Sequence, residues 1–256
     1  MIFESHAHYE DARFDEDREA LLSSFPQKGI DYVVNVGSSL KTTQQSIALA
    51  KQYDFIYAAA GVHPEETAEL NEENFAWLCE QMKQEKVVAV GEIGLDYHWD
   101  EPERKIQKVW FERQIALARQ VSLPMIIHSR DAAQDTLDIM KVCKAEEAGG
   151  VIHCFSYGVE MARECLNMGF YIGIGGVLTF KNAKKLKEVA KYVPLDRILL
   201  ETDCPYMAPE PHRGKRNSSI YLPYVAETLA TIKGVDVEEV YQTTRENGKQ
   251  MYRIQV

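Results

Sequence analysis

Short apolar runs rich in β-branched residues alternate with longer amphipathic segments along the whole of this 256-residue chain. The runs predict strands over residues 2–5, 32–36, 55–61, 87–92, 124–128, 150–154, 170–174 and 197–203. The amphipathic segments predict helices over residues 15–25, 40–52, 71–86, 103–121, 132–145, 159–168, 183–193, 221–233 and 237–252. Eight strands, each followed by a helix, favour an α/β fold of the (β/α)8 TIM-barrel type. An open, doubly wound parallel sheet is the competing topology.

The length of the chain suits one such barrel, which occupies about 250 residues as a single domain. No internal repeat, low-complexity tract or Pro/Ser-rich linker divides the sequence. We therefore expect residues 1–256 to form one domain. The least regular stretch, residues 206–219, follows the last predicted strand, where it would form a loop at the mouth of the barrel.

Composition limits the location and the partners of the protein. No apolar stretch approaches the roughly 20 residues that cross a bilayer, so we expect no membrane association. The five cysteines include no CxxC pair, which is typical of reduced thiols in a cytoplasmic protein. A net charge of −10 argues against a protein that coats nucleic acid, but it allows an enzyme that binds one strand end beside bound cations. The sequence leaves the oligomeric state open, with a monomer among the alternatives.

Side chains that bind divalent metal ions follow several of the predicted strands, directly or within a few residues. The candidate ligands are His6, His8, Glu92, His128, His153 and Asp203. Because the carboxyl ends of parallel strands meet at one face of a barrel, we expect these side chains to form a single metal site. The spacing of His6 and His8 directs both imidazoles to one face of a strand, where they can bind the same ion.

Each candidate ligand also has an alternative interpretation. His6 and His8 could be incidental surface histidines, and His128 and His153 satisfied core histidines. A buried Glu92 could form a structural salt bridge, although a carboxylate that ends an apolar strand is costly to bury without a cation. The joint placement of all six at strand ends favours the metal site over these alternatives.

The two carboxylates of this set are the candidate catalytic residues. Glu92 can bridge two metal ions, and Asp203 can accept the proton of an attacking water molecule. Glu201 lies two residues before Asp203, on the same strand face and one layer deeper, where it can orient a histidine.

Cationic and histidine side chains near the predicted barrel mouth indicate an anionic substrate. The candidate substrate-binding residues are His63, Arg130, Arg213, Lys215 and Arg216. The guanidinium of Arg130 matches phosphate geometry, and His63 can donate a hydrogen bond to a phosphate or carboxylate oxygen. A loop-shaping role for His63 and a solvated face for the loop cations are the alternatives.

Several segments, in chain order, resemble the TatD family of metal-dependent deoxyribonucleases. They are His6-Ala-His8, Gly61-Val-His-Pro64, Gly91-Glu-Ile-Gly-Leu-Asp-Tyr97, Ile127-His-Ser-Arg130, His153-Cys-Phe155, Glu201-Thr-Asp203, Arg213-Gly-Lys-Arg-Asn217 and Asn247 with Met251-Tyr252. One departure is Glu4, where the family commonly has Asp before its HxH motif.

The resemblance implies an amidohydrolase-type TIM barrel that holds one or two divalent ions, whether Zn, Mg or Mn, on the six candidate ligands. It also implies hydrolysis of DNA phosphodiester bonds from a strand end, as a 3′-to-5′ exonuclease on single strands. Two alternatives stay open on the sequence. One is a hydrolase of a small ester, lactone, amide or phosphoester on the same scaffold, and the other is a non-catalytic binding protein.

Overall fold

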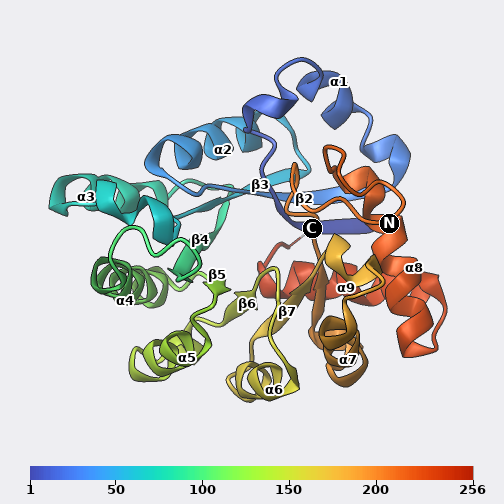
Figure 1. Cartoon of the computed structure of the whole chain (residues 1–256). Helices are drawn as coiled ribbons and strands as arrows, with labels where there is room; N and C mark the ends of the chain where they lie inside the picture. The colour runs from blue at the N-terminus through green and yellow to red at the C-terminus, as the bar shows by residue number, and fades with distance from the viewer. Residues whose placement is uncertain (256) are drawn as a thin grey trace.

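The eight predicted strands form one parallel sheet in the computed structural model, which describes residues 1–255. The strands are β1 (Ile2–Ala7), β2 (Ile30–Val36), β3 (Ile56–Ala60), β4 (Val87–Asp96), β5 (Met125–Arg130), β6 (Gly150–Ile152), β7 (Tyr171–Ile174) and β8 (Ile198–Leu200). Each strand pairs with the next along the chain. A further parallel bridge joins Ala7 to Cys204, beyond β8, so the sheet curls into a nearly closed barrel (Figure 1). The consecutive strand order confirms the TIM barrel and excludes the doubly wound sheet, whose strand order reverses.

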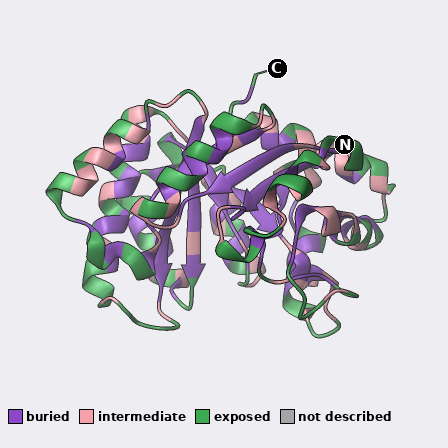
Figure 2. Ribbon diagram, turned by 90° about the horizontal axis from the view of Figure 1, so that it is seen from above, coloured by how far each residue is buried: buried purple, intermediate pink, exposed green. Residues whose placement is uncertain are grey.

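Helices surround the barrel, as Figure 1 shows. They are α1 (Arg18–Ser23), α2 (Leu40–Gln52), α3 (Glu72–Gln81), α4 (Arg104–Val121), α5 (Ala133–Val142), α6 (Val159–Asn167), α7 (Lys184–Tyr192), α8 (Leu222–Lys233) and α9 (Val237–Met251). Short 3-10 helices lie in the connections, at Ala12–Phe14, Pro26–Lys28, Pro64–Glu69, Ala145–Glu147, Gly176–Thr179, Leu195–Arg197 and Ser219–Tyr221. The strands are buried and each helix exposes its outer face (Figure 2), which explains the continuous apolar runs and the amphipathic segments of the sequence. Within residues 1–255, no helix is both long and apolar enough to span a bilayer.

Every predicted element is present, and the differences lie in the boundaries. The first helix was expected over residues 15–25, but only Arg18–Ser23 is α-helical because 3-10 helices flank it on both sides. The third helix ends at Gln81 instead of residue 86. Strand β4 continues to Asp96, four residues beyond its predicted end. Strand β8 ends at Leu200, so Glu201 and Asp203 lie just past the sheet.

The last helix packs across the opposite end of the barrel from the strand carboxyl ends. Asn247 in α9 donates hydrogen bonds of 2.9 and 2.8 Å to the carbonyl oxygens of Leu195 and Ile198, before and in β8. The hydroxyl of Tyr252 donates to the carbonyl oxygen of Ser5 at 2.7 Å, and its ring stacks on Phe3. The residues after α8 therefore hold the strands at the amino-terminal end of the barrel, and the end with the strand carboxyl termini is left free for a site.

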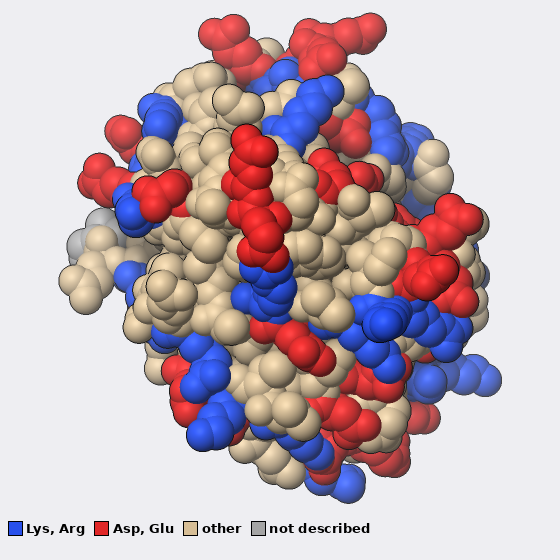
Figure 3. All heavy atoms as spheres, turned by 90° about the vertical axis from the view of Figure 1, so that its left-hand side faces the viewer, with Lys and Arg blue, Asp and Glu red and all other residues tan. Residues whose placement is uncertain are grey.

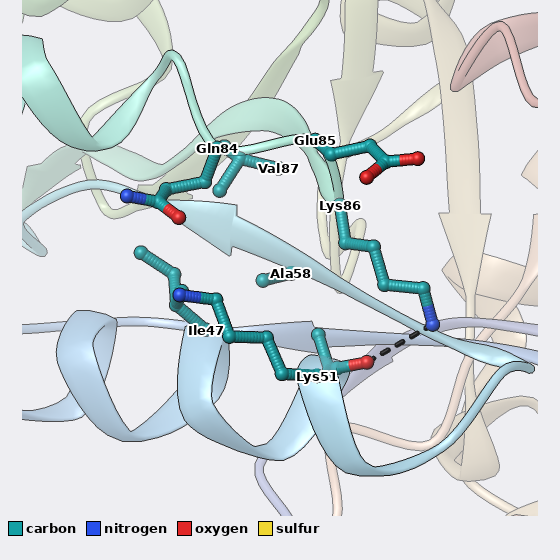
Figure 4. A pocket seen from close by; sticks show the side chains of 8 residues that line it. Ile47, Lys51, Ala58, Gln84, Glu85, Lys86 and Val87 are labelled. Atoms are coloured by element: carbon teal, nitrogen blue, oxygen red, sulfur yellow. Dashed lines mark hydrogen bonds between the residues drawn. The ribbon is translucent and has the colours of Figure 1, made fainter.

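A small hollow of about 280 Å³ lies on the outside of the barrel, between α2 and the start of β4 (Figure 4). Lys86 beside it donates to the carbonyl oxygens of Ala50, Tyr53 and Asp54, at 3.0, 2.6 and 3.0 Å. These carbonyls at the end of α2 lack helical partners, so the ammonium group satisfies them and complements the negative end of the helix dipole.

Candidate metal centre

The six predicted ligands converge at the carboxyl ends of the strands. They come from five strands or the residues that follow them: His6 in β1, His8 just after it, Glu92 in β4, His128 in β5, His153 after β6 and Asp203 after β8. All except His6, which is fully buried, line a cavity of about 900 Å³. Residues up to 197 positions apart in the chain thus meet in one place, which surface histidines or unrelated core histidines would not do.

His6, His8 and Asp203 form the first cluster of the centre. The Nε2 atoms of His6 and His8 are 3.1 Å apart, and they lie 3.6 and 3.3 Å from Oδ1 of Asp203. Ligand atoms at 2.0–2.1 Å from a tetrahedral ion lie about 3.4 Å from one another. The cluster therefore has the dimensions of a metal site. Asp203 adopts φ of 55°, a left-handed conformation that costs a non-glycine residue about 1–3 kcal/mol and is found at functional sites.

Glu92, His128 and His153 form the second cluster. Oε1 of Glu92 lies 3.0 Å from Nδ1 of His128 and 2.8 Å from Nε2 of His153, and these two nitrogens are 3.4 Å apart. The other carboxylate oxygen, Oε2, lies 3.5 Å from Nε2 of His6, in the first cluster. Glu92 is thus placed between the clusters with one oxygen toward each, as a ligand that bridges two ions requires.

In two histidines, a hydrogen bond at one ring nitrogen fixes the other ring nitrogen as the one that faces the centre. Nδ1 of His8 donates to the carbonyl oxygen of Val36 at 2.8 Å, and Nε2 of His128 donates to Oδ2 of Asp96 at 3.0 Å. In the neutral rings, the nitrogens that face the carboxylates therefore carry lone pairs and no proton. Lone pairs directed at carboxylate oxygens are stabilised by a cation between them, so the donor set fits divalent ions.

The pKa values of His8 and His128 show the same demand for positive charge, whereas burial lowers the pKa of His6 to about 4. Burial lowers the pKa of His128, but its hydrogen bonds with Asp96 and Glu92 outweigh that effect and raise it to about 9. The pKa of His8 is likewise well above its ordinary value, because contacts with Asp203 and Glu10 overcome burial. The carboxylates therefore favour cations at this place, and divalent ions meet that demand.

A glycine allows β4 and β5 to approach at the centre. Gly94 has φ of 145°, and a side chain there would overlap the carbonyl oxygen of His128. His128 pairs with Gly94 across the two strands, so the missing side chain lets it lie against Glu92 and Asp96 on β4.

Comparison with known proteins identifies the family. The family model described as TatD related DNase matches residues 3–253. The chain belongs to the TatD family. It is a metal-dependent hydrolase, in agreement with the clusters that can hold metal ions.

Individual TatD relatives cover nearly the whole chain. An uncharacterized metal-dependent hydrolase of Bacillus subtilis, YabD, is 48% identical over 99% of this chain and 100% of its own. A protein of Erwinia tasmaniensis named 3′-5′ ssDNA/RNA exonuclease TatD is 30% identical over 94% of this chain and 96% of its own. The crystal structure of YJJV, a TatD homologue of Escherichia coli, superposes with a TM-score of 0.93 at 29% identity, covering 99% of this chain and 98% of that one.

The structure separates the predicted substrate-binding residues of this TatD protein into two groups. His63 and Arg130 line the cavity. Arg213, Lys215 and Arg216 lie in the loop after β8 and do not line it. Arg216 instead forms a two-pronged ion pair with Asp17, at 2.7 and 2.6 Å. The loop is therefore beside the cavity, and a direct contact of Arg216 with substrate would require that ion pair to open.

Several residues of the site were not predicted, and four of them bear on its chemistry. Asp96 accepts a hydrogen bond from His128, and Trp99 and Tyr206 line the mouth of the cavity. Lys185 lines the cavity as a second basic residue beside Arg130. Only Asp96 had a usable signal, because it lies four residues after Glu92 and so faces the same side of a continued strand. Glu201, predicted to lie deeper, has Oε1 3.8 Å from Nδ1 of His153.

Proposed function

We propose that this TatD hydrolase cleaves phosphodiester bonds at the 3′ end of single-stranded DNA and removes nucleotides stepwise toward the 5′ end. The observation that carries the proposal is a single cavity that joins a centre for divalent ions to cationic and aromatic side chains. The Erwinia relative, named as an exonuclease on single-stranded DNA and RNA, supports the same activity.

The aromatic residues at the mouth suit unpaired bases. Among the large apolar side chains that are exposed in residues 1–255, only Trp99 and Tyr206 line the cavity, with 64% and 45% of their surface exposed. Stacking of a base on an aromatic ring contributes about 1–3 kcal/mol per base and requires that the base be free of a duplex. This favours a single strand over a duplex or a small ester.

His63 and Arg130 suit the charge of the phosphodiester. Burial and the neighbouring His128 lower the pKa of His63 to about 3, so the ring is neutral. Its Nδ1 accepts a hydrogen bond of 3.3 Å from the backbone N–H of Glu65, which leaves the proton on Nε2. Nε2 lies 3.7 Å from Oε1 of Glu92, so the ring can donate to a phosphate oxygen beside the centre. Arg130, at the end of β5, can add a guanidinium contact.

The chain's own residues then divide the chemistry as follows. His6, His8 and Asp203 would hold one ion, His128 and His153 would hold a second, and Glu92 would contribute to both. Bound divalent ions acidify water and offset the negative charge of the reacting phosphate. Asp203 accepts the proton of the attacking water. Its side chain is 16% exposed, so it reaches the cavity, and its pKa is lowered because the contacts with the histidines, first that with His8, outweigh burial. His63 donates a hydrogen bond to the phosphate oxygens, and the positive charge of Arg130 offsets the negative charge that develops on them.

The acidic lining of the cavity leaves a small ester, lactone or phosphoester as the alternative substrate. Glu10, Asp11, Glu65 and Glu66 line it together with the carboxylates of the centre. To separate the two, the protein is stripped of metal, reloaded with Zn, Mn or Mg singly, and given a 5′-labelled single strand and a panel of small esters in parallel. We expect a ladder of strands that shorten from the 3′ end. Ester turnover without any shortening of the strand would overturn the proposal.

A further inference from the structure

A group of exposed cations lies at one side of the cavity mouth. Residues 181–191, at the start of and along α7, contain five lysines and one glutamate, a net charge of +4 in a chain whose total is −10. Lys185 lines the cavity, and Lys181 and Lys184 are exposed beside it. Positive charge is thus concentrated on a segment that borders the cavity through Lys185, in an otherwise acidic protein.

The loop after β8 adds a further cation to this group. The guanidinium of Arg213 stacks on the ring of Phe180 at 4.3 Å, directly before Lys181. The backbone N–H of Glu210 in the same loop donates to Oγ1 of Thr179 at 2.9 Å, which holds the loop against the start of α7. Two segments distant in the sequence therefore present one surface, the cationic rim, made of Lys181, Lys184, Lys185 and Arg213.

The cations of the rim have no acidic partners. Among residues 1–255, none of the four forms an ion pair, although Glu188 and Glu210 are near in sequence. On the face made by α3 and α4, by contrast, basic and acidic side chains are interspersed (Figure 3) and pair with each other, as Arg113 does with Glu72 at 2.5 Å. Unpaired cations that share one rim repel each other, and a polyanion offsets that repulsion.

We propose that the cationic rim binds the phosphates of the single strand that lie 5′ to the nucleotide in the cavity. This inference rests on the proposed function. Lys185 lines the cavity, Lys181 and Lys184 are exposed on the same segment outside the lining, and Arg213 contacts Phe180 directly before Lys181, so a strand whose 3′ end is in the cavity can leave over the rim. Contacts with the phosphates of a nucleic acid carry no sequence preference, as an exonuclease requires.

The test uses the variant Lys181→Gln/Lys184→Gln, which removes two rim cations that do not line the cavity. Its matched control is Lys51→Gln/Lys144→Gln, which removes the same charge from two exposed lysines that do not line the cavity. Lys51 lies in the last turn of α2, and Lys144 follows α5. Each protein is loaded with metal. Binding is followed by fluorescence anisotropy with a strand of roughly 15 nucleotides whose 3′-terminal linkages are phosphorothioates that resist hydrolysis. Turnover of a dinucleotide, which extends little beyond the cavity, is measured in parallel.

We expect the rim variant to bind the long strand roughly tenfold more weakly. Its plot of log affinity against log salt should become shallower by about 1.4, because each phosphate contact on a single strand contributes about 0.7 to the slope. Dinucleotide turnover should stay within about twofold of wild type, and the control should match wild type in both measurements. An unchanged salt slope, or an equal loss in the control, would overturn the inference. Lysine-dependent strand binding by a wild-type protein that releases no nucleotide would support the rim and overturn the proposed function.

Discussion

Asp96 sets the orientation of His128 and is not itself part of either ligand cluster. Its Oδ2 accepts the Nε2 proton of His128 at 3.0 Å, and the backbone N–H of His98 donates to its Oδ1 at 2.8 Å. The carboxylate is therefore held from one side and holds the imidazole on the other. This arrangement keeps Nδ1 of His128 directed at Glu92, which is the geometry the second cluster needs.

We expect Asp96→Asn to weaken metal binding by about 10–100-fold, because loss of the partner that orients a ligand histidine has an effect of that size. Competition with a chromophoric chelator measures the affinity. Asp131→Asn is the matched control, since Asp131 faces the exposed His98 at 3.4 Å and touches no ligand. Equal affinity in the Asp96 variant and wild type would show that His128 does not depend on this contact.

Asp203→Asn should lower turnover of single-stranded DNA by at least about 10²-fold, because a general base contributes about 10²–10⁴-fold and an amide cannot accept the proton. The fold should persist, since asparagine has nearly the same shape and the backbone bond from Asp203 N to His6 O remains. Circular dichroism and metal content check these conditions. Full activity of a folded, metal-loaded variant would contradict the role of Asp203.

Trp99→Ala should raise KM for a single strand by roughly tenfold, as loss of one stacked base costs about 1–3 kcal/mol, with kcat little changed. Trp99→Phe should restore most of the affinity because it keeps an aromatic face. Tyr192→Ala serves as the control, since Tyr192 is exposed but lies outside the cavity lining. A raised KM in the control as well would exclude a specific contact at Trp99.

The candidate ligands could be predicted because each carries a functional group that is rare at the end of an apolar run. Asp96 escaped notice because β4 was expected to end at Glu92, which placed Asp96 in a loop of unknown direction. The ion pair of Arg216 with Asp17, 199 residues away, could not be predicted from the sequence. Contacts between loops depend on three-dimensional proximity that no local pattern encodes.

At the scale of elements, the seam between β1 and the segment after β8 is held by one buried carboxylate. Glu4 accepts hydrogen bonds from the backbone N–H groups of His6 and Thr202, and from the hydroxyls of Thr202 and Ser219 at 2.7 and 2.8 Å. Glu4 has no exposed surface, and burial raises its pKa to about 7. The longer side chain in place of the usual Asp therefore leaves the seam fully hydrogen-bonded, which the sequence alone could not establish.

Glu4→Ala should destabilise the protein by at least about 3 kcal/mol, because buried donors lose their acceptor at about 1–3 kcal/mol each. Glu4→Gln keeps one acceptor oxygen and should cost less. Chemical denaturation measures both, with Glu16→Ala on the exposed surface as the control. If Glu4→Ala were as stable as the control, the hydrogen bonds across the seam would not hold the barrel together.

Element positions followed from hydrophobic periodicity, whereas element ends did not. The sequence predicts that strand β8 extends through Asp203, but it ends at Leu200. Beyond it, the chain contacts β1 through isolated backbone hydrogen bonds, such as that from Asp203 N to His6 O. Those bonds close the barrel and set the direction of Asp203. Strand ends at a site are shaped by the partners of the backbone, and these partners come from the far end of the chain.

At the scale of the whole molecule, the metal centre joins five strands, so bound metal should stabilise the entire barrel. We propose that residues 1–256 unfold as one unit, because the six candidate ligands reach from the first strand to the end of the last and share one sheet. A metal ion at 1,000 times its dissociation constant contributes about 4 kcal/mol to a protein that binds it only when folded. For a chain of this size that corresponds to a rise in Tm of roughly 8–16 °C.

Scanning calorimetry of the metal-free protein and of the protein with saturating Zn or Mn should show one transition in each case, shifted upward as a whole by metal. The variant His6→Ala/His8→Ala, which lacks two ligands of the first cluster, should retain only part of the shift because His128, His153 and Glu92 remain. Two separate transitions, or a shift confined to part of the unfolding heat, would contradict a single domain. A shift in the variant equal to that of wild type would show that His6 and His8 do not bind the metal. A partial shift would instead mean that the ligands left in the variant still bind metal and still stabilise the folded barrel.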